Sequence, residues 1–348
     1  MKKETVKEFD ILTIGGATID LIADTEEGEY IQAGYLKFIG FPYGGKVSTK
    51  DVKTFFGGGA SNAAVAASRL GLKVATILSI GEDQFGEEIL EHLRQEGIDT
   101  SFILKTREEE SGMSYIIEIE GKDHIIFTNR GANQKLKINK TILRRIKAKW
   151  FYIASLYEAS SYLNRLGVFC KNQNINIAWA PGSSEIKKGF LKFKTFLEKV
   201  DVMSLNRSEA LAFAFAKNHS LVPEDTEAIL KTLQKMGPKM VIITDGHKGS
   251  YLINSQRKII YQPAIKVKAV ETTGAGDAYF STFVSLITKI QKTKNDFNVE
   301  NLTEKEIRYA MLGAAINSAE VVKYLGAQNN LLNESELKQK IEEISSKN

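Results

Sequence analysis

The chain has 348 residues, of which 43% are hydrophobic and 26% are charged. This composition is ordinary for a folded protein, so it argues against extended disorder and supplies a sizeable core. Lysine and arginine number 47 against 42 acidic residues, a formal net charge of +5. Because both signs alternate along the chain and no aromatic-plus-basic motif accompanies them, we expect no nucleic-acid partner.

Neither the cysteine content nor the first residues indicate secretion. Cys170 is the single cysteine, so an internal disulfide is impossible and a reducing compartment fits best. The opening MKKETVKEFD has no apolar run of the kind that a secretory signal needs. The stretch 278–288 is well short of the ~20 apolar residues that cross a bilayer. We therefore expect a cytoplasmic protein with no membrane segment.

Short apolar runs alternate with helical patterns over most of the chain, which is typical of strands joined by crossover helices in a mainly parallel sheet. The pattern EEILEHLRQEG predicts one such helix, with its apolar residues on one face and Gly97 as its stop. Thr303 and Glu306 form a capping pattern that predicts a helix start in the last third. The predicted strands, in chain order, are 11–15, 74–78, 150–154, 175–179, 200–205 and 240–244.

Two regions, about 28–55 and about 110–130, break this alternation with extended strands and turns. The alternating polar and apolar residues of MSYIIEIEGKDHIIF predict a hairpin around Gly121. Neither region has a helix of its own to cover it, so we expect the two to pair into a small β flap. The chain is then a single α/β domain, residues 1–348, in which the flap can act as a lid over a cleft.

The segment VETTGAGDAYFSTF leads from small residues directly into an apolar helical run. Backbone N–H groups at such a helix start can converge on an anion, which the helix dipole also favours. Phosphoryl transfer needs little beyond an anion site, a metal and a base for the attacking hydroxyl. Asp277 follows the last glycine and can supply that base. The alternative is an ordinary glycine turn in which Asp277 only caps the helix.

A second glycine-rich segment, FFGGGASNAAVAASRLG, precedes a predicted helix that is rich in alanine. Glycines at the entrance of a helix permit a close approach of the backbone to a ligand. Asn62 offers both a donor and an acceptor to sugar hydroxyls. The alternative is that the small residues serve tight packing, and the two explanations can hold together.

These two segments give the sequence its resemblance to the ribokinase, or PfkB, family of carbohydrate kinases. GGGASNAAVAASRLG is similar to the family's first signature and ETTGAGDAYFSTF to its second, in the right order and at a wide separation. Shorter stretches resemble other parts of the family, among them GGATID, RGAN, NRSE, TDGHKG and GAAINSAEVVKYLGAQ. The resemblance implies a ribokinase-like fold, with a central, mainly parallel sheet flanked by helices and a small β lid.

The resemblance also implies an ATP- and Mg²⁺-dependent kinase that phosphorylates a hydroxyl of a small sugar or sugar derivative. Asp277 would be the catalytic base, and the anion hole for the transferred phosphoryl group would be formed by Gly274, Ala275 and Gly276. The residues implied in binding the acceptor are Asp20, Gly57, Gly58, Asn62 and Arg130.

On the nucleotide side, the residues implied by the resemblance are Asn206, Glu209, Thr244, Gly246, Gly249, Thr273 and Asn317. Glu209 would also help to arrange magnesium through water. Asn206 and Glu209 form a capping-box pattern as well, so a purely structural role for these two residues stays open.

Three departures from the family pattern bear on the acceptor and the cofactors. Glu271 replaces the usual Asp at a position that borders a monovalent-cation site in several members, so activation by potassium (K⁺) stays an open question. Gly59 and Thr18 stand where ribose-specific members carry Lys and Asn, so ribose is not favoured. A sugar or sugar acid is therefore the first expectation and a nucleoside such as adenosine, cytidine or inosine the second.

Two other classes of function compete with a kinase. A non-catalytic regulator that binds a sugar or nucleotide is disfavoured by the intact segment 274–277. A dinucleotide-dependent oxidoreductase would need Gly-x-Gly-x-x-Gly after the first strand, which instead reads IGGATID. Because exposed strand edges are prone to pairing, the lid strands could also join two copies into a homodimer.

Overall fold

The computed structural model describes residues 5–33, 36–119, 124–157 and 160–346. The largest sheet in these ranges has eight strands, in the order β16-β15-β14-β13-β12-β11-β1-β6. Neighbours from β14 to β6 run parallel, whereas β15 and β16 form an antiparallel edge. The strands are β1 (Lys7–Ile14), β6 (Val74–Ile77), β11 (Ile146–Ile153), β12 (Asn176–Trp179), β13 (Val202–Asn206), β14 (Met240–Thr244), β15 (Ser250–Ile253) and β16 (Ile259–Gln262).

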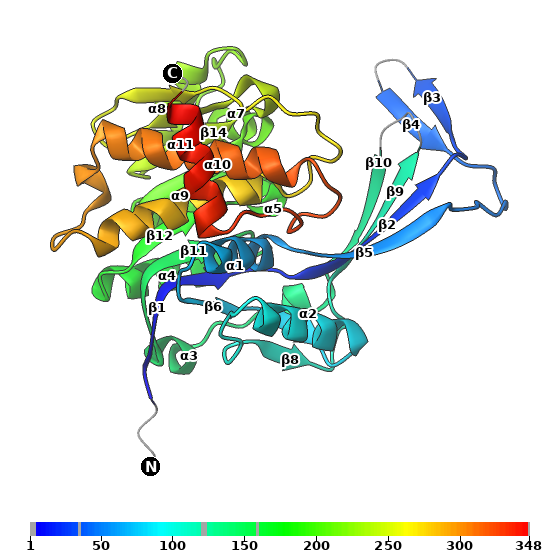
Figure 1. The fold of residues 1–348 in the computed structure, drawn as a ribbon, viewed down its shortest axis with the longest axis horizontal. Helices are drawn as coiled ribbons and strands as arrows, with labels where there is room; N and C mark the ends of the chain where they lie inside the picture. The colour runs from blue at the N-terminus through cyan, green and yellow to red at the C-terminus, as the bar shows by residue number, and fades with distance from the viewer. Residues whose placement is uncertain (1–4, 34–35, 120–123, 158–159, 347–348) are drawn as a thin grey trace.

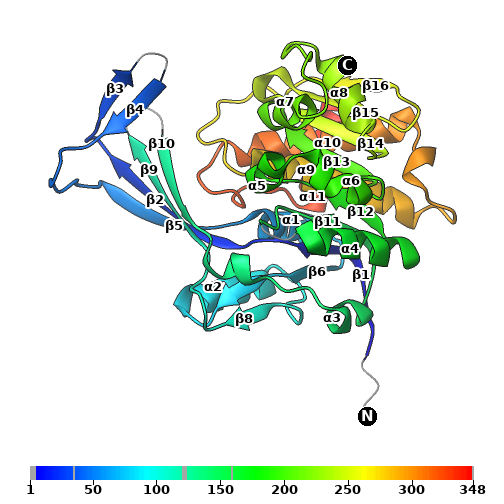
Figure 2. The same ribbon diagram turned by 180° about the vertical axis from the view of Figure 1, so that it is seen from behind.

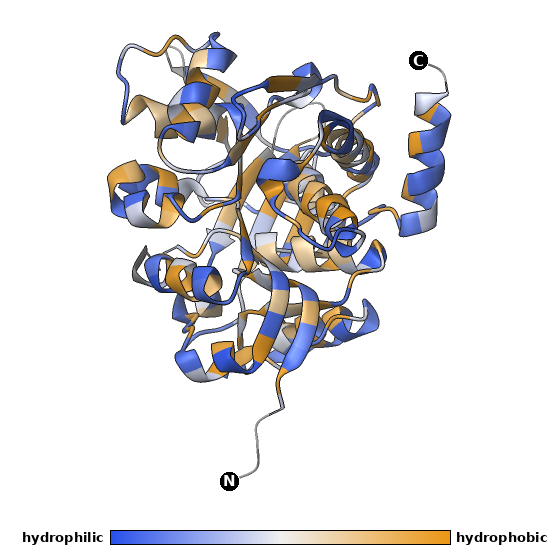
Figure 3. Ribbon diagram, turned by 90° about the vertical axis from the view of Figure 1, so that its left-hand side faces the viewer, coloured by the Kyte–Doolittle hydropathy of each residue, from blue (hydrophilic) through white to orange (hydrophobic). Residues whose placement is uncertain are grey.

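Helices cover both faces of this sheet (Figures 1 and 2). One layer is formed by α1 (Gly59–Arg69), α9 (Ala275–Lys292) and α10 (Glu304–Val321), and α11 (Glu334–Ser345) packs on the outer side of this layer (Figure 3). The opposite face carries α4 (Ser160–Asn172), α6 (Lys194–Leu197), α7 (Arg207–Phe215) and α8 (Thr226–Gln234). The other helices are α2 (Gln84–Gln95), α3 (Lys140–Arg144) and α5 (Ser183–Lys188). Within the ranges described, no helix has the length and apolar character needed to cross a bilayer.

The core is split by the sheet into two clusters, because successive side chains of a strand point to opposite faces. Ile11 and Trp150 belong to the cluster beneath α1, α9 and α10, whereas the next residues, Leu12 and Phe151, belong to the other cluster. Figure 3 shows apolar residues concentrated on the central strands and on the inner sides of the helices. This explains why the central strands read as continuous apolar runs in the sequence.

The predicted mainly parallel sheet is confirmed. Each of the six predicted strands overlaps a parallel strand of the large sheet. The predicted helix corresponds to α2, and Gly97 follows its end with a φ of 74°. Thr303 and Glu306 form the capping box at the start of α10. The antiparallel edge was not expected, since β15 and β16 have only four residues each.

A four-stranded sheet extends away from the main body (Figure 1), in the order β10-β9-β2-β5. Its strands are β2 (Thr18–Thr25), β5 (Asp51–Gly57), β9 (Met113–Ile119) and β10 (His124–Asn129). The expected flap did not include β2, which follows the loop after β1 directly. The predicted hairpin turn at Gly121 lies outside the described residues, although β9 and β10 pair antiparallel on either side. Two further strand pairs are β3 (Glu29–Ala33) with β4 (Leu36–Gly40) and β7 (Ser79–Gly81) with β8 (Leu104–Thr106).

Candidate active site

A cavity of about 330 Å³ lies at the carboxyl ends of β1, β11, β12, β13 and β14. Open α/β sheets bind their ligands at this edge. The starts of α1, α7 and α9 complete its wall. The cavity is lined by Gly16, Gly59, Ala154, Ser155, Tyr157, Ala180, Pro181, Gly182, Ser204, Leu205, Asn206, Glu209, Thr244, Gly274, Gly276, Asp277 and Phe280.

Asp277 faces this cavity from the first turn of α9. Its Oδ2 atom accepts a hydrogen bond from Asn62 Nδ2 at 2.9 Å. Burial raises the pKa of Asp277 above its ordinary value, and the hydrogen bond from Asn62 partly offsets that rise. Because Asn62 lies on α1, the two glycine-rich segments of the sequence meet at this carboxylate.

The start of α9 presents backbone N–H groups to the cavity. Gly274 is the N-cap in the left-handed conformation, with a φ of 79°, and a Cβ there would lie 2.4 Å from Ala327 Cβ. In the part of the chain that the structure describes, no side chain caps this helix. The N–H of Ala275 instead donates to Thr272 O at 3.2 Å. The N–H groups of Gly276 and Asp277 are therefore the ones oriented for an anion, and Ala275 is a weaker candidate than the sequence suggested.

Asp20 lies on β2, at the junction of the four-stranded sheet and the main body. Its side chain is buried, and its Oδ1 atom accepts a hydrogen bond from Thr18 Oγ1 at 3.0 Å. Burial raises the pKa of Asp20, whereas hydrogen bonds from Ser114 and Thr18 lower it. The residue is thus held in place by neighbours on β2 and β9, and it does not itself line the cavity.

The glycines before α1 are required by close packing. A Cβ at Gly57 would lie 2.1 Å from Asp20 Oδ2. Gly58 has a φ of 92°, and a Cβ there would lie 2.5 Å from Ala17 Cα. Gly59 lines the cavity, where a Cβ would lie 3.6 Å from Asp277 Oδ1. The first two glycines therefore seat α1 against the loop after β1, and the third leaves room beside Asp277.

Arg130 stacks on an aromatic ring at the edge of the cavity. Its guanidinium carbon lies 4.1 Å from the centre of the Tyr157 ring. Burial raises the pKa of Tyr157, the charge of Arg130 opposes that rise, and the charges of Glu185, Asp277 and Asp20 add to it. Tyr157 lines the cavity, so Arg130 lies next to the cavity wall although it is not itself a lining residue.

Asn206 and Glu209 lie across the cavity, at the start of α7. They form the capping box that the sequence allowed: Asn206 Oδ1 accepts from Glu209 N at 2.9 Å, and Asn206 N donates to Glu209 Oε2 at 3.0 Å. Both residues also line the cavity. Burial raises the pKa of Glu209, and the negative charge of Asp277 raises it further. Carboxylate and amide groups near the negative charge of Asp277 fit Mg²⁺ held through water.

Four predicted nucleotide residues lie at the end of β14, in the turn after it, or just before α9. Thr244 lines the cavity at the end of β14. Gly246 and Gly249 bound the next turn, with φ values of 52° and 95°. A Cβ at Gly249 would lie 2.3 Å from Gln262 O, so packing requires that glycine. Thr273 precedes the N-cap of α9, and it does not line the cavity, nor do the two glycines.

Asn317 has a different environment from the one expected beside a nucleotide. The residue is fully buried in α10. Its Nδ2 atom donates to Thr282 Oγ1 at 2.8 Å, and its Oδ1 atom accepts from Leu332 N at 2.9 Å. These bonds tie α10 to α9 and to the loop before α11, which indicates a structural role for Asn317.

Two buried amides near the site were given no role in the sequence analysis. Asn133 holds the loop after β1: its Oδ1 atom accepts from Ala17 N at 3.0 Å, and its Nδ2 atom donates to Ala17 O at 2.9 Å. Gln328 donates to Asn62 Oδ1 at 3.0 Å. Both belong to stretches that resembled the family, RGAN and GAQ, but a polar residue in a loop carries no sequence signal that it is buried.

Comparisons with known proteins agree with this arrangement. A family model described as pfkB family carbohydrate kinase matches residues 9–296. Ribokinase of Haemophilus influenzae is 26% identical over 303 residues, which cover 84% of this chain and 90% of that protein. A nucleoside kinase of Methanothermobacter thermautotrophicus is 25% identical over 283 residues, or 80% of this chain and 82% of that protein. The structure of Arabidopsis thaliana ribokinase complexed with ribose and ATP has a TM-score of 0.77 at 20% identity, covering 96% of this chain and 99% of that one.

Proposed function

Because the chain belongs to the pfkB family of carbohydrate kinases, and is thus a phosphotransferase with an alcohol group as acceptor, we propose that it transfers the γ-phosphoryl group of ATP to a hydroxyl of a small sugar or sugar derivative. The observation that carries this proposal is the meeting of Asp277 with the uncapped start of α9 in one cavity. A carboxylate can take a proton there, and N–H groups can hold a phosphate.

In this proposal, Asp277 accepts the proton of the acceptor hydroxyl as that hydroxyl attacks the phosphoryl group. The N–H groups of Gly276 and Asp277 stabilise the charge that spreads over the transferred oxygens. Asn62 orients the carboxylate through its hydrogen bond of 2.9 Å. Asp20 and Arg130 bind acceptor groups from the side of the small sheet.

Asn206 and Glu209 would hold Mg²⁺ through water, since both residues line the same cavity as Asp277. Mg²⁺ bound there would neutralise part of the phosphate charge of ATP. Thr244 lies on the same wall and is the proposed neighbour of the nucleotide. Glu271 is buried, and its Oε2 atom accepts from Gly326 N at 3.1 Å.

We further propose that residues 1–348 act as one unit in which the small sheet is a lid. Two observations support this: β2 carries Asp20 directly after the loop that lines the cavity, and β5 continues into α1 at Gly57 and Gly58. Closure over the acceptor would exclude water, which otherwise competes as phosphate acceptor.

The acceptor class is tested by incubating the protein with ATP and Mg²⁺ and a panel of pentoses, hexoses, sugar acids and nucleosides, with ADP release as the readout. We expect one sugar or sugar acid to be phosphorylated with a kcat/KM at least about 100-fold above the nucleosides. If a nucleoside is the preferred acceptor, the alternative function, that of a nucleoside kinase, is favoured instead. If no acceptor raises the rate of ADP release above the rate measured without acceptor, the proposal is contradicted.

A homodimer through the small sheet is proposed from its exposed apolar side chains. Tyr115 and Phe127 are neighbours in register on β9 and β10, and each is about half exposed, at 49% and 53%. Val52 of β5 is likewise exposed. We expect sedimentation equilibrium to give twice the monomer mass, and Phe127→Lys to give the monomer mass. A wild-type chain that sediments as a monomer at about 50 μM would rule out this interface.

A further inference from the structure

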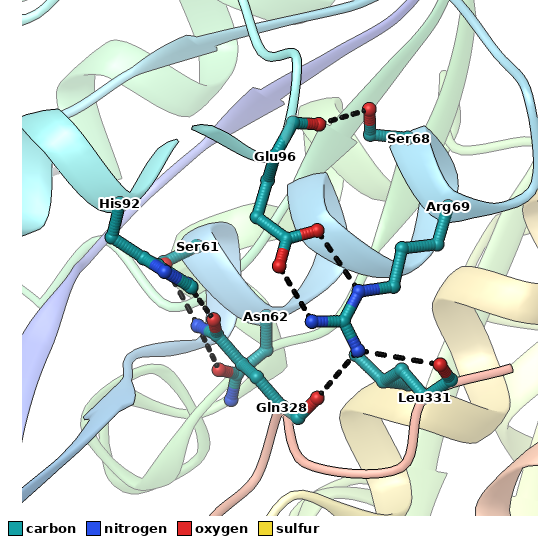
Figure 4. A network of polar contacts seen from close by, with 8 residues as sticks. All are labelled: Ser61, Asn62, Ser68, Arg69, His92, Glu96, Gln328 and Leu331. Atoms are coloured by element: carbon teal, nitrogen blue, oxygen red, sulfur yellow. Dashed lines mark hydrogen bonds and ion pairs between the residues drawn. The ribbon is translucent and has the colours of Figure 1, made fainter. Parts of the chain in front are cut away.

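A chain of hydrogen bonds leads from the surface of α2 to Asp277, and Figure 4 shows its first links. His92 Nε2 lies 2.6 Å from Gln328 Oε1. Gln328 Nε2 donates to Asn62 Oδ1 and to Ser61 Oγ, each at 3.0 Å. Asn62 Nδ2 then donates to Asp277 Oδ2 at 2.9 Å. Gln328, Ser61 and Asn62 are all buried, so these bonds do not compete with bulk water.

The direction of every bond in this chain is fixed by Asp277. An ionised carboxylate can only accept, so Asn62 must turn its NH₂ group toward Asp277 and its oxygen toward Gln328. That oxygen requires the NH₂ group of Gln328, which leaves Gln328 Oε1 facing His92. His92 Nε2 therefore carries a proton and donates. Hydrogen bonds aligned in this way polarise one another and strengthen the last one.

The backbone carbonyl and the side-chain oxygen of Gln328 are each held by residues outside the site. Arg69 Nη1 donates to Gln328 O at 2.9 Å, and the same guanidinium forms two hydrogen bonds with Glu96, at 2.9 Å and 2.5 Å. The ring of His92 stacks on Phe56, with 3.9 Å between ring centres and 2° between planes. The backbone and the side-chain oxygen of Gln328 are thus each held by residues of α1, α2 or β5.

The loop that carries Gln328 also contacts the start of α9. Ala327 packs against Gly274 so closely that a Cβ on the glycine would lie 2.4 Å from its own. Gly326 N donates to Glu271 Oε2 at 3.1 Å. Residues 326–328 therefore touch both segments that meet at Asp277, although none of the three lines the cavity.

Resting on the proposed role of Asp277 as the base, we propose that Gln328 is a positioning residue that keeps the amide of Asn62 in one orientation, with His92 holding Gln328 in turn. Without Gln328, the oxygen of Asn62 loses its donor and the amide is free to rotate. A rotated amide would turn its oxygen toward the carboxylate. The repulsion between these oxygens would move the Asp277 side chain away from the position that proton transfer needs. Small displacements of a reacting group reduce the rate strongly while leaving binding of the other substrate intact.

The test is a cycle of variants in the full chain, assayed with ATP and Mg²⁺ and the acceptor that the panel identifies. We expect Gln328→Leu to lower kcat about 10-fold with the KM for ATP unchanged within about twofold. In the background of Asn62→Ala, the same substitution should have no further effect, because Asn62 is the residue through which Gln328 acts. Gln328→Leu with the wild-type kcat, or a second 10-fold loss in the Asn62→Ala background, would overturn the inference.

Two further variants guard against a simple loss of folding. His92→Phe keeps the stack on Phe56 and removes only the donor to Gln328, and we expect it to lower kcat about threefold. If Gln328→Leu does not fold, an unchanged kcat in His92→Phe refutes the chain. Asn329→Ala is the matched control: within the described residues, the side chain of this exposed neighbour bonds only Leu325 O, and the kcat of the variant should equal that of the wild type. A wild-type chain that phosphorylates no acceptor would instead refute the proposed function.

Discussion

Asp277→Asn is expected to lower kcat about 1,000-fold while ATP still binds with a dissociation constant within a few-fold of the wild-type value. The amide keeps the shape of the side chain but cannot accept a proton from the acceptor hydroxyl. Nucleotide affinity should persist because the N–H groups of the α9 start remain in place. Steady-state kinetics and calorimetric titration with ATP measure the two quantities separately.

The matched control is Asp296→Asn, which changes an exposed aspartate beyond the end of α9 and should leave kcat unchanged. The pH profile offers a second check. Burial raises the pKa of Asp277, and a base works only when ionised, so activity should fall as the pH drops through this raised pKa. An Asp277→Asn variant that retains more than a tenth of the wild-type kcat would exclude this residue as the base.

Gly274→Ala is expected to damage both the fold and the activity. An alanine here must keep the backbone φ of 79°, and its Cβ would lie only 2.4 Å from Ala327 Cβ. Left-handed backbone and overpacking together should cost about 2–4 kcal/mol of unfolding free energy. The displaced start of α9 should also lower kcat/KM for ATP by about 100-fold. Thermal unfolding and kinetics measure the two effects.

Gly276→Ala separates the anion site from the fold. A Cβ at Gly276 has no protein atom within 4 Å, so the melting temperature should equal that of the wild type. The added methyl group nevertheless lies next to the N–H groups that we assign to the phosphate and would hinder its approach. We therefore expect kcat/KM for ATP to fall at least about 10-fold. If Gly276→Ala has wild-type kinetics, the phosphate does not bind at the start of α9.

The main sheet was predictable because its strands are buried on both faces. Ile11 and Leu12 illustrate this: they belong to opposite core clusters, and such strands read as continuous apolar runs. The strands that make up the small sheet were harder to predict. β2 follows β1 after only a short loop, and its polar residues Asp20 and Asp24 conceal a strand that pairs with β5 and β9.

The candidate site was predictable to the extent that glycine patterns mark helix starts. Gly274 and Gly58 indicated where α9 and α1 begin, and Asn62 lies one turn into α1, so its meeting with Asp277 follows once the two helices pack together. Gln328 was beyond reach, because its role depends on contacts 266 residues apart in the chain. Asn317 lies in the core, where its side chain bonds Thr282 and Leu332, and the sequence alone did not indicate these contacts.

The most direct measurement is a crystal structure of the protein with a non-hydrolysable ATP analogue, Mg²⁺ and the acceptor that the panel identifies. We expect an acceptor hydroxyl oxygen within about 3.2 Å of an Asp277 carboxylate oxygen. We also expect terminal phosphate oxygens at hydrogen-bond distance from the N–H groups of Gly276 and Asp277. An acceptor bound with no hydroxyl near Asp277, or a terminal phosphate held away from the start of α9, would contradict the proposed mechanism.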